Sequence, residues 1–241
     1  MFAVIVKRLQ DAGHTVHLGK AVQRLEGSPN QITALVTDGG TFQTDIVVGC
    51  VQVPDLAAML PDNVKVYRDA LRQIRFLANV CLVLTLKQPL SDFYWTNMTE
   101  ASAPFVGIIE QTNWADRNDY NHKHVVYISA YVTQDDPRLK MTAAELVDMY
   151  LPSIRKLFPR FDATLIEAQT VWKALYAQPL VHVGYRHLVP DIASPISNFF
   201  VCTMAQIYPH DRQVSNGVVL ARKTTEYVKR YYETRLSSPL R

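Results

Sequence analysis

The sequence predicts a fold of mixed α/β and α+β character, in which an antiparallel sheet with helices occupies the middle of the chain. Long apolar or alternating runs at 76–86 and 124–132 are typical of paired strands. A Thr-x-x-Glu capping box at 142–145 begins a helix after them. The last fifth of the chain, residues 198–236, reads as an apolar strand, a polar loop and a long helix.

The composition is that of an ordinary globular chain. Its 241 residues are 48% hydrophobic and 20% charged, which suits one large domain or two small ones. The formal net charge of +3 is small and lies mostly on the C-terminal helix, so we expect no nucleic-acid partner. Tyr and Val interleave with the basic residues of 222–235, which favours core packing over nucleic-acid binding.

The cysteines and the apolar runs bear on location. Cys50, Cys81 and Cys202 each lie within an apolar, strand-like run, and no Cys-x-x-Cys pair occurs. This usage favours a reduced, cytoplasmic chain. No apolar stretch approaches the roughly 20 residues needed to cross a bilayer, and the N-terminus lacks a secretion signal. We therefore expect a soluble protein without a transmembrane segment.

The first 60 residues predict one helix, several short strands and a second helix. Residues 3–12 have an amphipathic pattern that predicts a helix, and Gly13 ends it. Proline 54 suits the first turn of a short helix at 54–60, where its missing amide costs nothing. The expected strands between them are 14–18, 21–26, 31–37, 41–43 and 45–50.

The middle of the chain predicts an antiparallel sheet that is partly buried on both faces. The helix that begins at the capping box is expected to kink or break before Pro152 and to resume through Phe158. Another extended run surrounds Trp172. The expected strands are 76–86, 93–97, 104–111, 124–132 and 163–177.

The C-terminal segment combines a strand at 199–202, a loop at 203–215 and a helix that opens at Asn216-Gly217. Tyr208-Pro209 ends regular pairing. A loop of this kind points the free amides of the helix, and its positive end, at whatever lies above the strand. Such an arrangement can hold a phosphate or an electron-rich ring edge. The apolar positions at helical spacing are Val218, Ala221, Val228 and Tyr232.

This strand, loop and helix resemble the C-terminal FAD-contacting segment of the superfamily of flavin amine oxidases, protoporphyrinogen oxidases and phytoene desaturases. The likeness is greatest to a bacterial branch whose loop reads Tyr-Pro-x-Asp-Arg, here 208–212. In that superfamily the segment lies under the isoalloxazine ring, and the helix start faces the pyrimidine end of the flavin. Thr203-Met204 replaces the usual Gly-Asp, which puts the family's carboxylate contact to the cofactor in question.

The first 60 residues resemble the same family in the order of their elements. In relatives, the residue that matches Val22 contacts the FAD adenine through its backbone. The matching positions are Gly13, Val16, Val22, Asp38-Gly39, Asp45, Val47-Val48 and Pro54. The middle region resembles the family's substrate domain, an antiparallel sheet that roofs the flavin, and Trp172, Pro179 and Gly184 resemble the run that returns from it.

The resemblance implies three parts: 1–60 and 191–241 form an incomplete, Rossmann-like FAD-binding part, and 61–190 form the substrate domain. Family members begin with a Gly-x-Gly-x-x-Gly turn that binds the FAD pyrophosphate. None of the nine glycines here fits that pattern. We expect this chain alone to hold FAD weakly or not at all. A missing segment or a separate chain would carry the motif, or the chain is a relative that no longer binds flavin.

The resemblance also implies site residues. Asp211 and Arg212 either orient the flavin as a charge-assisted pair or stabilise the loop at the surface. Asn216-Gly217 either presents the helix start to the cofactor or is a plain N-cap. The implied cofactor-binding residues are Val22, Thr203, Met204, Tyr208, Pro209, Asp211, Arg212, Asn216, Gly217 and Val218. The aromatic residues Tyr94, Trp114 and Trp172 either face the substrate or are simply packed.

Other chemistry finds little support in the sequence. The pairs His122/His124 and His182/His187 have no Cys or carboxylate at ligand spacing, so no metal site is expected. Asp135-Asp136 reads as a solvated turn. Motifs of serine hydrolases, zinc proteases and P-loop proteins are absent. No catalytic residue can be named, because a flavin accepts the hydride and the protein mainly positions and desolvates the substrate.

The leading hypothesis is therefore the C-terminal portion of an FAD-dependent oxidoreductase of the amine oxidase type, which transfers hydride from a C–N or C–C bond of a small molecule to flavin. The alternative is a catalytically silent binding or assembly subunit that retains the substrate-domain fold and binds a partner chain. Amine, porphyrinogen, carotenoid and sugar-nucleotide chemistry all occur on this scaffold, so the substrate stays open.

Overall fold

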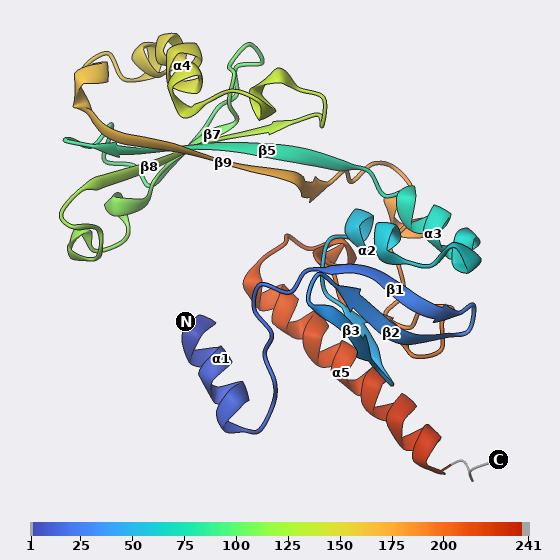
Figure 1. Ribbon diagram of the computed structural model, residues 1–241. Coiled ribbons are helices and arrows are strands. Elements are labelled where there is room, and N and C mark those ends of the chain that lie inside the picture. The colour runs from blue at the N-terminus through green and yellow to red at the C-terminus, as the bar shows by residue number, and fades with distance from the viewer. Residues whose placement is uncertain (1, 238–241) are drawn as a thin grey trace. The chain divides into compact units, whose positions relative to one another are not determined.

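The computed structural model describes residues 2–237. The chain divides into two compact units, both visible in Figure 1. Unit 1 runs to Ile74 and resumes at His182, and unit 2 comprises Arg75–Val181. Residues 61–74 and 182–190, which were expected in the middle domain, thus belong to unit 1. Both units combine helices with antiparallel strands, so the predicted mixed fold class is confirmed.

Unit 1 contains a three-stranded antiparallel sheet, in the order β1-β2-β3, and a short parallel pair, β4 with β10. Its helices and strands are α1 (Phe2–Asp11), β1 (Val22–Ser28), β2 (Gln31–Thr37), β3 (Gly40–Gln43), β4 (Val47–Gly49), α2 (Val53–Met59), α3 (Lys65–Arg72), β10 (Phe199–Val201) and α5 (Val214–Ser237). Short 3₁₀-helices of this unit are η1 (Asp62–Val64), η6 (Tyr185–His187) and η7 (Met204–Ile207).

The two ends of the chain meet at Asn198, whose side chain is fully buried. Its Oδ1 accepts a hydrogen bond from Ile32 N at 2.8 Å, and its Nδ2 donates to Ile32 O at 2.6 Å and to Asp45 O at 2.9 Å. The neighbouring Ser197 N–H donates to Asn30 O at 2.9 Å. Asn198 therefore joins the β1–β2 hairpin and the start of β4 to β10 by hydrogen bonds to backbone groups of Ile32 and Asp45.

Unit 2 is a five-stranded sheet in the order β6-β7-β8-β5-β9, and Figure 1 shows α4 lying over one face of it. Its helices and strands are β5 (Phe76–Leu86), β6 (Trp95–Asn97), β7 (Gly107–Glu110), β8 (His124–Val132), α4 (Ala143–Leu157) and β9 (Ile166–Pro179). Its 3₁₀-helices are η2 (Gln111–Asn113), η3 (Arg117–Tyr120), η4 (Pro137–Leu139) and η5 (Ala163–Leu165).

The core of unit 2 follows from the period of two along β5. Alternate residues from Phe76 to Leu86 are buried on the face that α4 covers, while the residues between them are half-buried on the other face. From α4, the core side chains are Leu146, Val147, Tyr150 and Ile154. The ring of Tyr150 packs edge-on against Phe105 at a centroid distance of 5.2 Å.

Helix α4 begins as expected and continues further than expected. Thr142 and Glu145 form the capping box: Glu145 N donates to Thr142 Oγ1 at 3.3 Å, and Thr142 N donates to Glu145 Oε2 at 2.7 Å. The predicted break before Pro152 is wrong, because the helix runs unbroken to Leu157 with the proline inside it. Pro152 is on the exposed side. Burial of the opposite side of the helix outweighs the missing amide at this position.

Two further differences concern residues 14–18 and residues 65–72. Residues 14–18 form no strand; instead the His17 ring packs on Phe42 with centroids 4.9 Å apart. The sequence analysis did not predict α3, a polar helix with an i,i+4 ion pair between Lys65 and Asp69.

Helix α5 also differs from its prediction. It begins at Val214, two residues before the expected opening. The side of the helix that is buried also differs from the predicted one. The inward residues are Leu220, Thr224, Val228 and Tyr231. Val218, Ala221 and Tyr232 are exposed, so the predicted face is wrong apart from Val228. The apolar residues of α5 surround the helix, and periodicity alone could not decide between two faces.

No helix within residues 2–237 is both long and apolar enough to span a membrane.

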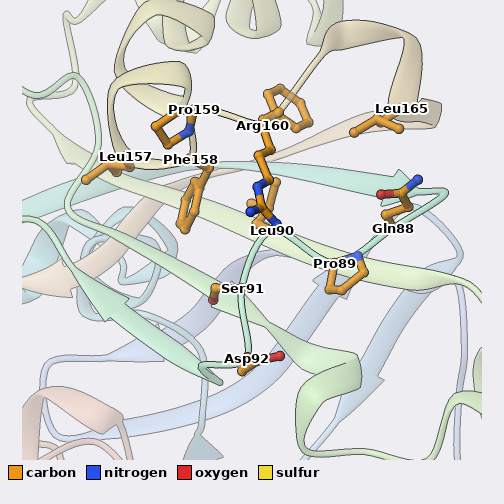
Figure 2. A pocket seen from close by; sticks show the side chains of 11 residues that line it. Gln88, Pro89, Leu90, Ser91, Asp92, Leu157, Phe158, Pro159, Arg160 and Leu165 are labelled. Carbon is orange, nitrogen blue, oxygen red and sulfur yellow. The ribbon is translucent and has the colours of Figure 1, made fainter.

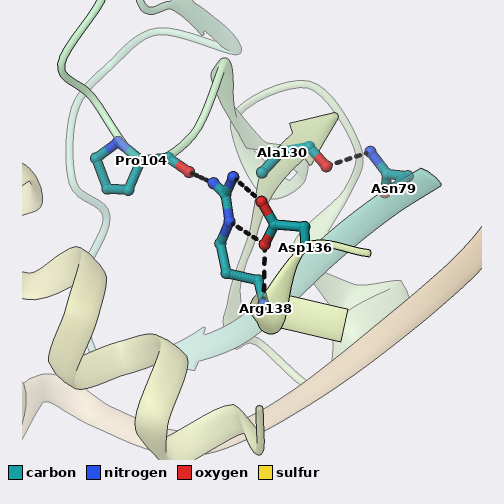
Figure 3. Close-up of polar contacts among 5 residues, drawn as sticks. All are labelled: Asn79, Pro104, Ala130, Asp136 and Arg138. Carbon is teal, nitrogen blue, oxygen red and sulfur yellow. Dashed lines mark hydrogen bonds and ion pairs between the residues drawn. The ribbon is translucent and has the colours of Figure 1, made fainter. Parts of the chain in front are cut away.

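A partly buried ion pair closes the turn after β8, as Figure 3 shows. Arg138 donates from Nε to Asp136 Oδ1 at 2.8 Å and from Nη2 to Asp136 Oδ2 at 2.7 Å. Its Nη1 also donates to Pro104 O at 2.6 Å. The hydrogen bonds from Arg138 are the main reason why the pKa of Asp136 lies below its ordinary value. Asp136 was expected in a solvated turn, but it forms a bidentate pair that joins two loops.

This pair predicts a pH-dependent stability. Since the folded pKa of Asp136 lies below the unfolded value of about 4, its contribution is complete above about pH 5 and is lost as the pH falls through the folded pKa. We expect Asp136→Asn to lower the free energy of unfolding of unit 2 by about 1–3 kcal/mol at pH 7, and by much less at pH 3. Urea unfolding followed by tryptophan fluorescence would measure it. Asp148→Asn, at an exposed site on α4, is the matched control, and an equal loss at both pH values would contradict the prediction.

Candidate functional site

The C-terminal loop, residues 203–213, lies between β10 and α5 and begins with η7. Thr203 is buried, and its N–H donates to Gln206 Oε1 at 2.7 Å. Gln206 Nε2 in turn donates to Pro190 O at 3.0 Å. The hydroxyl of Thr203 is buried as well; its oxygen faces the backbone N–H of Gln206 in a capping box, but no group within residues 2–237 accepts its hydrogen. A buried hydroxyl of this kind lowers stability unless a further group forms a hydrogen bond with it.

Tyr185 fixes the far side of this loop, although the sequence analysis did not identify it. It is buried, and its OH donates to Ala205 O at 3.0 Å. Its ring packs edge-on against Tyr208, with centroids 5.5 Å apart. Burial raises the pKa of Tyr185, so it stays a neutral donor to the loop. Tyr208 is followed by a cis peptide bond to Pro209, and both residues are exposed.

The residues between Pro209 and α5 use their polar groups mainly on the loop itself. Asp211 Oδ1 accepts from the backbone N–H of Arg212 at 2.8 Å, and Asp211 O accepts from Asn216 Nδ2 at 2.8 Å. Gly217 N–H donates to Gln213 O at 3.1 Å within the first turn of α5. Asn216 and Gly217 therefore lie inside the helix rather than at its opening. Gly217 lies beside Met204, since a Cβ at this position would be in van der Waals contact with Met204 Sδ at 3.4 Å.

Val22 and Val218 complete the predicted cofactor residues. Val22 is the first residue of β1 and pairs with Thr37, next to an irregularity in the register. Val22 therefore lies at the far end of β1 from the β1–β2 turn, and it is the turn end of this hairpin that Asn198 joins to β10. Val218 is exposed on the first turns of α5. Unit 1 thus brings the C-terminal loop and the β1–β3 sheet into one compact body.

The face of the unit 2 sheet opposite α4, called the aromatic face below, carries the predicted substrate residues. Directly paired residues on neighbouring antiparallel strands share a face. One row across the sheet is Trp95, Ile109, Tyr127, Val83 and Thr170. The next row is Asn97, Gly107, Ser129, Cys81 and Trp172. This face is apolar and aromatic, with hydrogen-bonding side chains but no charged side chain in either row.

The predicted aromatic residues occupy two edges of this sheet. Tyr94 and Trp114 pack together with ring centroids 6.0 Å apart, beside β6. Trp172 lies on β9, at the opposite edge, and its side chain is 69% exposed. Trp95 contacts Tyr94 at 6.3 Å and donates from Nε1 to Asn97 Oδ1 at 2.7 Å. The three predicted residues therefore do not form one cluster, and three strands separate Trp172 from the other two.

The centre of the aromatic face contains polar groups that the sequence analysis did not identify. Asn79 Nδ2 donates to Ser129 Oγ at 2.7 Å, and Tyr127 lies between the two aromatic edges. Burial raises the pKa of Tyr127, and nearby Tyr120, Cys81 and Tyr94 add to this effect. Tyr127 is therefore a neutral hydroxyl among apolar groups. The alternation of His124–Val132 could have indicated its orientation, once the pairing with β5 was known.

A cavity of about 520 Å³ lies elsewhere in unit 2, between the loop after β5 and the C-terminal end of α4. Figure 2 shows Phe158 and Arg160 on one side of it and the 88–92 loop on the other. None of the residues predicted from the sequence lines this cavity. Glu110 holds the loop, because its buried carboxylate accepts from Leu90 N at 2.8 Å and from Ser91 N at 3.2 Å.

Comparisons with known proteins identify a family for this chain. Residues 2–210 match the family model described as flavin containing amine oxidoreductase. No protein in the curated set matches the sequence.

Several solved structures have a fold similar to that of this chain. A candidate protoporphyrinogen oxidase from Exiguobacterium sp. 255-15 aligns with a TM-score of 0.67 at 13% identity, over 93% of this chain and 51% of its own. An oxidoreductase from Methanosarcina mazei aligns with a TM-score of 0.61 at 14% identity, over 82% of this chain and 46% of its own. Reduced UDP-galactopyranose mutase aligns with a TM-score of 0.61 at 11% identity, over 78% of this chain and 41% of its own. This chain thus spans about half the length of each.

Proposed function

This chain belongs to the flavin-containing amine oxidoreductase family, and we propose that it is the C-terminal portion of an FAD-dependent oxidoreductase of the amine oxidase type. The complete protein oxidises a C–N or C–C bond of a small molecule by hydride transfer to flavin. The observation that supports this proposal is the junction at Asn198, which joins the β1–β2 hairpin to β10, so that residues 1–60 and 191–241 belong to the same unit.

The residues of the C-terminal loop suit a flavin in one specific respect. The buried Thr203 hydroxyl has no acceptor for its hydrogen within the described chain, and a ring edge with hydrogen-bonding atoms would supply one. Bound flavin provides a two-electron acceptor. The loop residues Thr203, Met204, Tyr208, Pro209, Asp211 and Arg212 would hold it, together with Asn216, Gly217 and Val218 of α5 and the backbone of Val22. Tyr185 positions the loop through its hydrogen bond to Ala205 O.

The aromatic face of unit 2 is the proposed substrate surface. Its neutral Tyr127 and the Asn79–Ser129 pair offer hydrogen bonds, while Tyr94, Trp114 and Trp172 offer apolar rings. A surface without charged groups orients an apolar or planar substrate and excludes water from it. The cysteine usage supports a cytoplasmic location for this protein.

The short parallel pair supports the need for a further polypeptide segment. Within residues 2–237, β4 pairs with β10 and with no other strand. Parallel strands are normally found in larger sheets that are buried on both faces. We propose that a segment with a Gly-x-Gly-x-x-Gly motif adds to the free edge of β4, from the same reading frame or from a separate chain. A silent assembly subunit that binds a partner through this edge is the alternative.

The spectrum of the purified protein tests this proposal. We expect the 241-residue chain alone to be nearly colourless, because the pyrophosphate-binding turn is absent from it. The product of a reading frame extended upstream, or of co-expression with the chain that carries the motif, is expected to show visible flavin absorption. Sequencing the DNA upstream of the Met1 codon identifies which of these to produce.

Two variants make the test specific to the C-terminal loop. Thr203→Val removes the hydroxyl that lacks an acceptor while keeping the side-chain shape, and it is expected to weaken FAD binding by the completed protein about tenfold. Thr225→Val, on the exposed side of α5, is the matched control. If the completed, folded protein carries no flavin and binds no added FAD, the oxidoreductase proposal fails and the assembly subunit is favoured.

A further inference from the structure

Two cysteines that are far apart in the sequence lie next to each other in unit 1. Cys50 directly follows β4, and Cys202 directly follows β10. The parallel register places Val201 opposite Gly49, and Cys202 N–H donates to Gly49 O at 2.9 Å. The next residues of the two strands, Cys202 and Cys50, are therefore opposite one another. Sequence reasoning treated the cysteines as separate apolar residues, since only the strand pairing brings these two together.

The spacing of neighbouring strands suits a bond between these residues. Adjacent strands lie about 4.8 Å apart, and the Cα atoms of a disulfide are usually about 4.4–6.8 Å apart. Opposite residues of two paired strands also direct their side chains to the same face. The side chain of Cys202 contributes to the raised pKa of Cys50, as expected for two thiols that lie on the same face of neighbouring strands.

Exposure differs between the two thiols and assigns them different roles. Cys50 is exposed, so a reagent from solution can reach it, whereas Cys202 is half-buried. Burial raises the pKa of Cys50, and the Cys202 thiol raises it further. The reactive thiolate is therefore scarce at neutral pH, and its amount increases as the pH rises toward the folded pKa. The third cysteine, Cys81, lies on β5 in unit 2, opposite Trp172.

We propose that Cys50 and Cys202 form an oxidisable dithiol site that reacts with small disulfides, of which glutathione disulfide is the example used below. The thiolate of Cys50 attacks one sulfur of the disulfide, its S–S bond breaks, and one glutathione leaves as a thiol. The thiolate of Cys202 then attacks the Cys50 sulfur, the mixed disulfide breaks, and the second glutathione leaves. Two protein thiols are oxidised, one disulfide is reduced to two thiols, and the two protons pass to the departing glutathiones.

The position of the pair gives the bond a structural consequence. Cys202 immediately precedes Thr203, where the C-terminal loop begins, and Cys50 lies three residues before α2. A bond between them ties the start of that loop to the end of β4. Because the bond closes a very long loop of chain, it restricts the unfolded state and stabilises unit 1. This site is independent of flavin binding, since it requires only the β4–β10 pairing.

Peptide mapping of the full chain tests the proposal. The reduced protein is incubated with glutathione disulfide, its remaining thiols are alkylated, and trypsin is applied without reductant. The sequence places Cys50, Cys81 and Cys202 in the separate tryptic peptides 25–65, 76–87 and 187–212. We expect peptides 25–65 and 187–212 to be linked, with a mass lower by two hydrogen atoms, and Cys81 to be alkylated. The rate of linking is expected to increase from pH 7 to pH 9.

Serine variants separate the two steps. Cys202→Ser is expected to stop at a glutathione adduct on Cys50, and Cys50→Ser to give no linked peptide. Cys81→Ser is the matched control and is expected to link as the original protein does, with a midpoint of thermal unfolding higher by roughly 5–10 °C after oxidation. A stable glutathione adduct on Cys50 in the unsubstituted protein, full alkylation of both cysteines, or a link to Cys81 would overturn the proposal.

Discussion

Replacing Asn198 by alanine is expected to lower the free energy of unfolding of unit 1 by about 3–4 kcal/mol. The substitution removes three hydrogen bonds and leaves the N–H and C=O of Ile32 and the C=O of Asp45 without them. Each such buried group costs about 1–3 kcal/mol. Because all three tryptophans lie in unit 2, tryptophan fluorescence does not report on this change. Amide hydrogen exchange of Ile32 in β2 measures it directly, and we expect this amide to exchange at least a hundredfold faster.

A second asparagine in the same region provides the control. Asn30 is exposed in the β1–β2 turn, and it contacts Ser197 through its backbone carbonyl, which survives substitution. Asn30→Ala is therefore expected to leave the exchange of Ile32 within a few-fold of the original rate. If Asn198→Ala behaves like Asn30→Ala, the junction between the two ends of the chain is not a stabilising contact, and the observation that carries the flavoprotein proposal loses its weight.

Replacing Leu82 by alanine is expected to lower the free energy of unfolding of unit 2 by about 3–4 kcal/mol. Leu82 is fully buried at the centre of β5, in the same apolar cluster as Leu146 and Tyr150 of α4. The surrounding strands cannot collapse into the space, because β8 and β9 pair with β5 on both sides. Urea unfolding followed by tryptophan fluorescence measures the loss, since all three reporting side chains are in this unit.

The same strand contains a leucine on its other face. Leu77 is half-buried and points toward the aromatic face, so Leu77→Ala is expected to cost less than half as much as Leu82→Ala. Equal losses would show that the two faces of β5 are packed alike. The assignment of one face to the core and the other to a substrate surface would then be wrong.

Individual helices and strands were predicted correctly where the local sequence signal was clear. In α4, the Thr-x-x-Glu capping box indicated a helix start at Thr142, and the structure has it there. In β5, a long and mainly apolar run indicated a strand of a sheet partly buried on both faces, and the structure has one side in the core and the other half-buried. The break before Pro152 was wrong because local backbone preference did not include the buried side of the helix.

The candidate site was predicted only where it is continuous in sequence. The loop at 203–213 was found because it lies between a strand and a helix, whereas Tyr185 and Asn79 carried no local signal that linked them to a site. The same holds for the aromatic residues. Tyr94 and Trp114 are neighbours because β6 and η2 are adjacent, but Trp172 lies three strands away, and no spacing in the sequence reports strand order.

By itself, the sequence determined the family, the mixed fold class, the absence of a Gly-x-Gly-x-x-Gly turn and the position of the C-terminal loop, because these depend on residue type and short spacing. Only the tertiary structure decided which residues meet: Asn198 with Ile32 and Cys50 with Cys202. It also decided which side of α5 is buried. These are contacts between residues far apart in the chain, and strand pairing and burial of one face, rather than local preference, fix them.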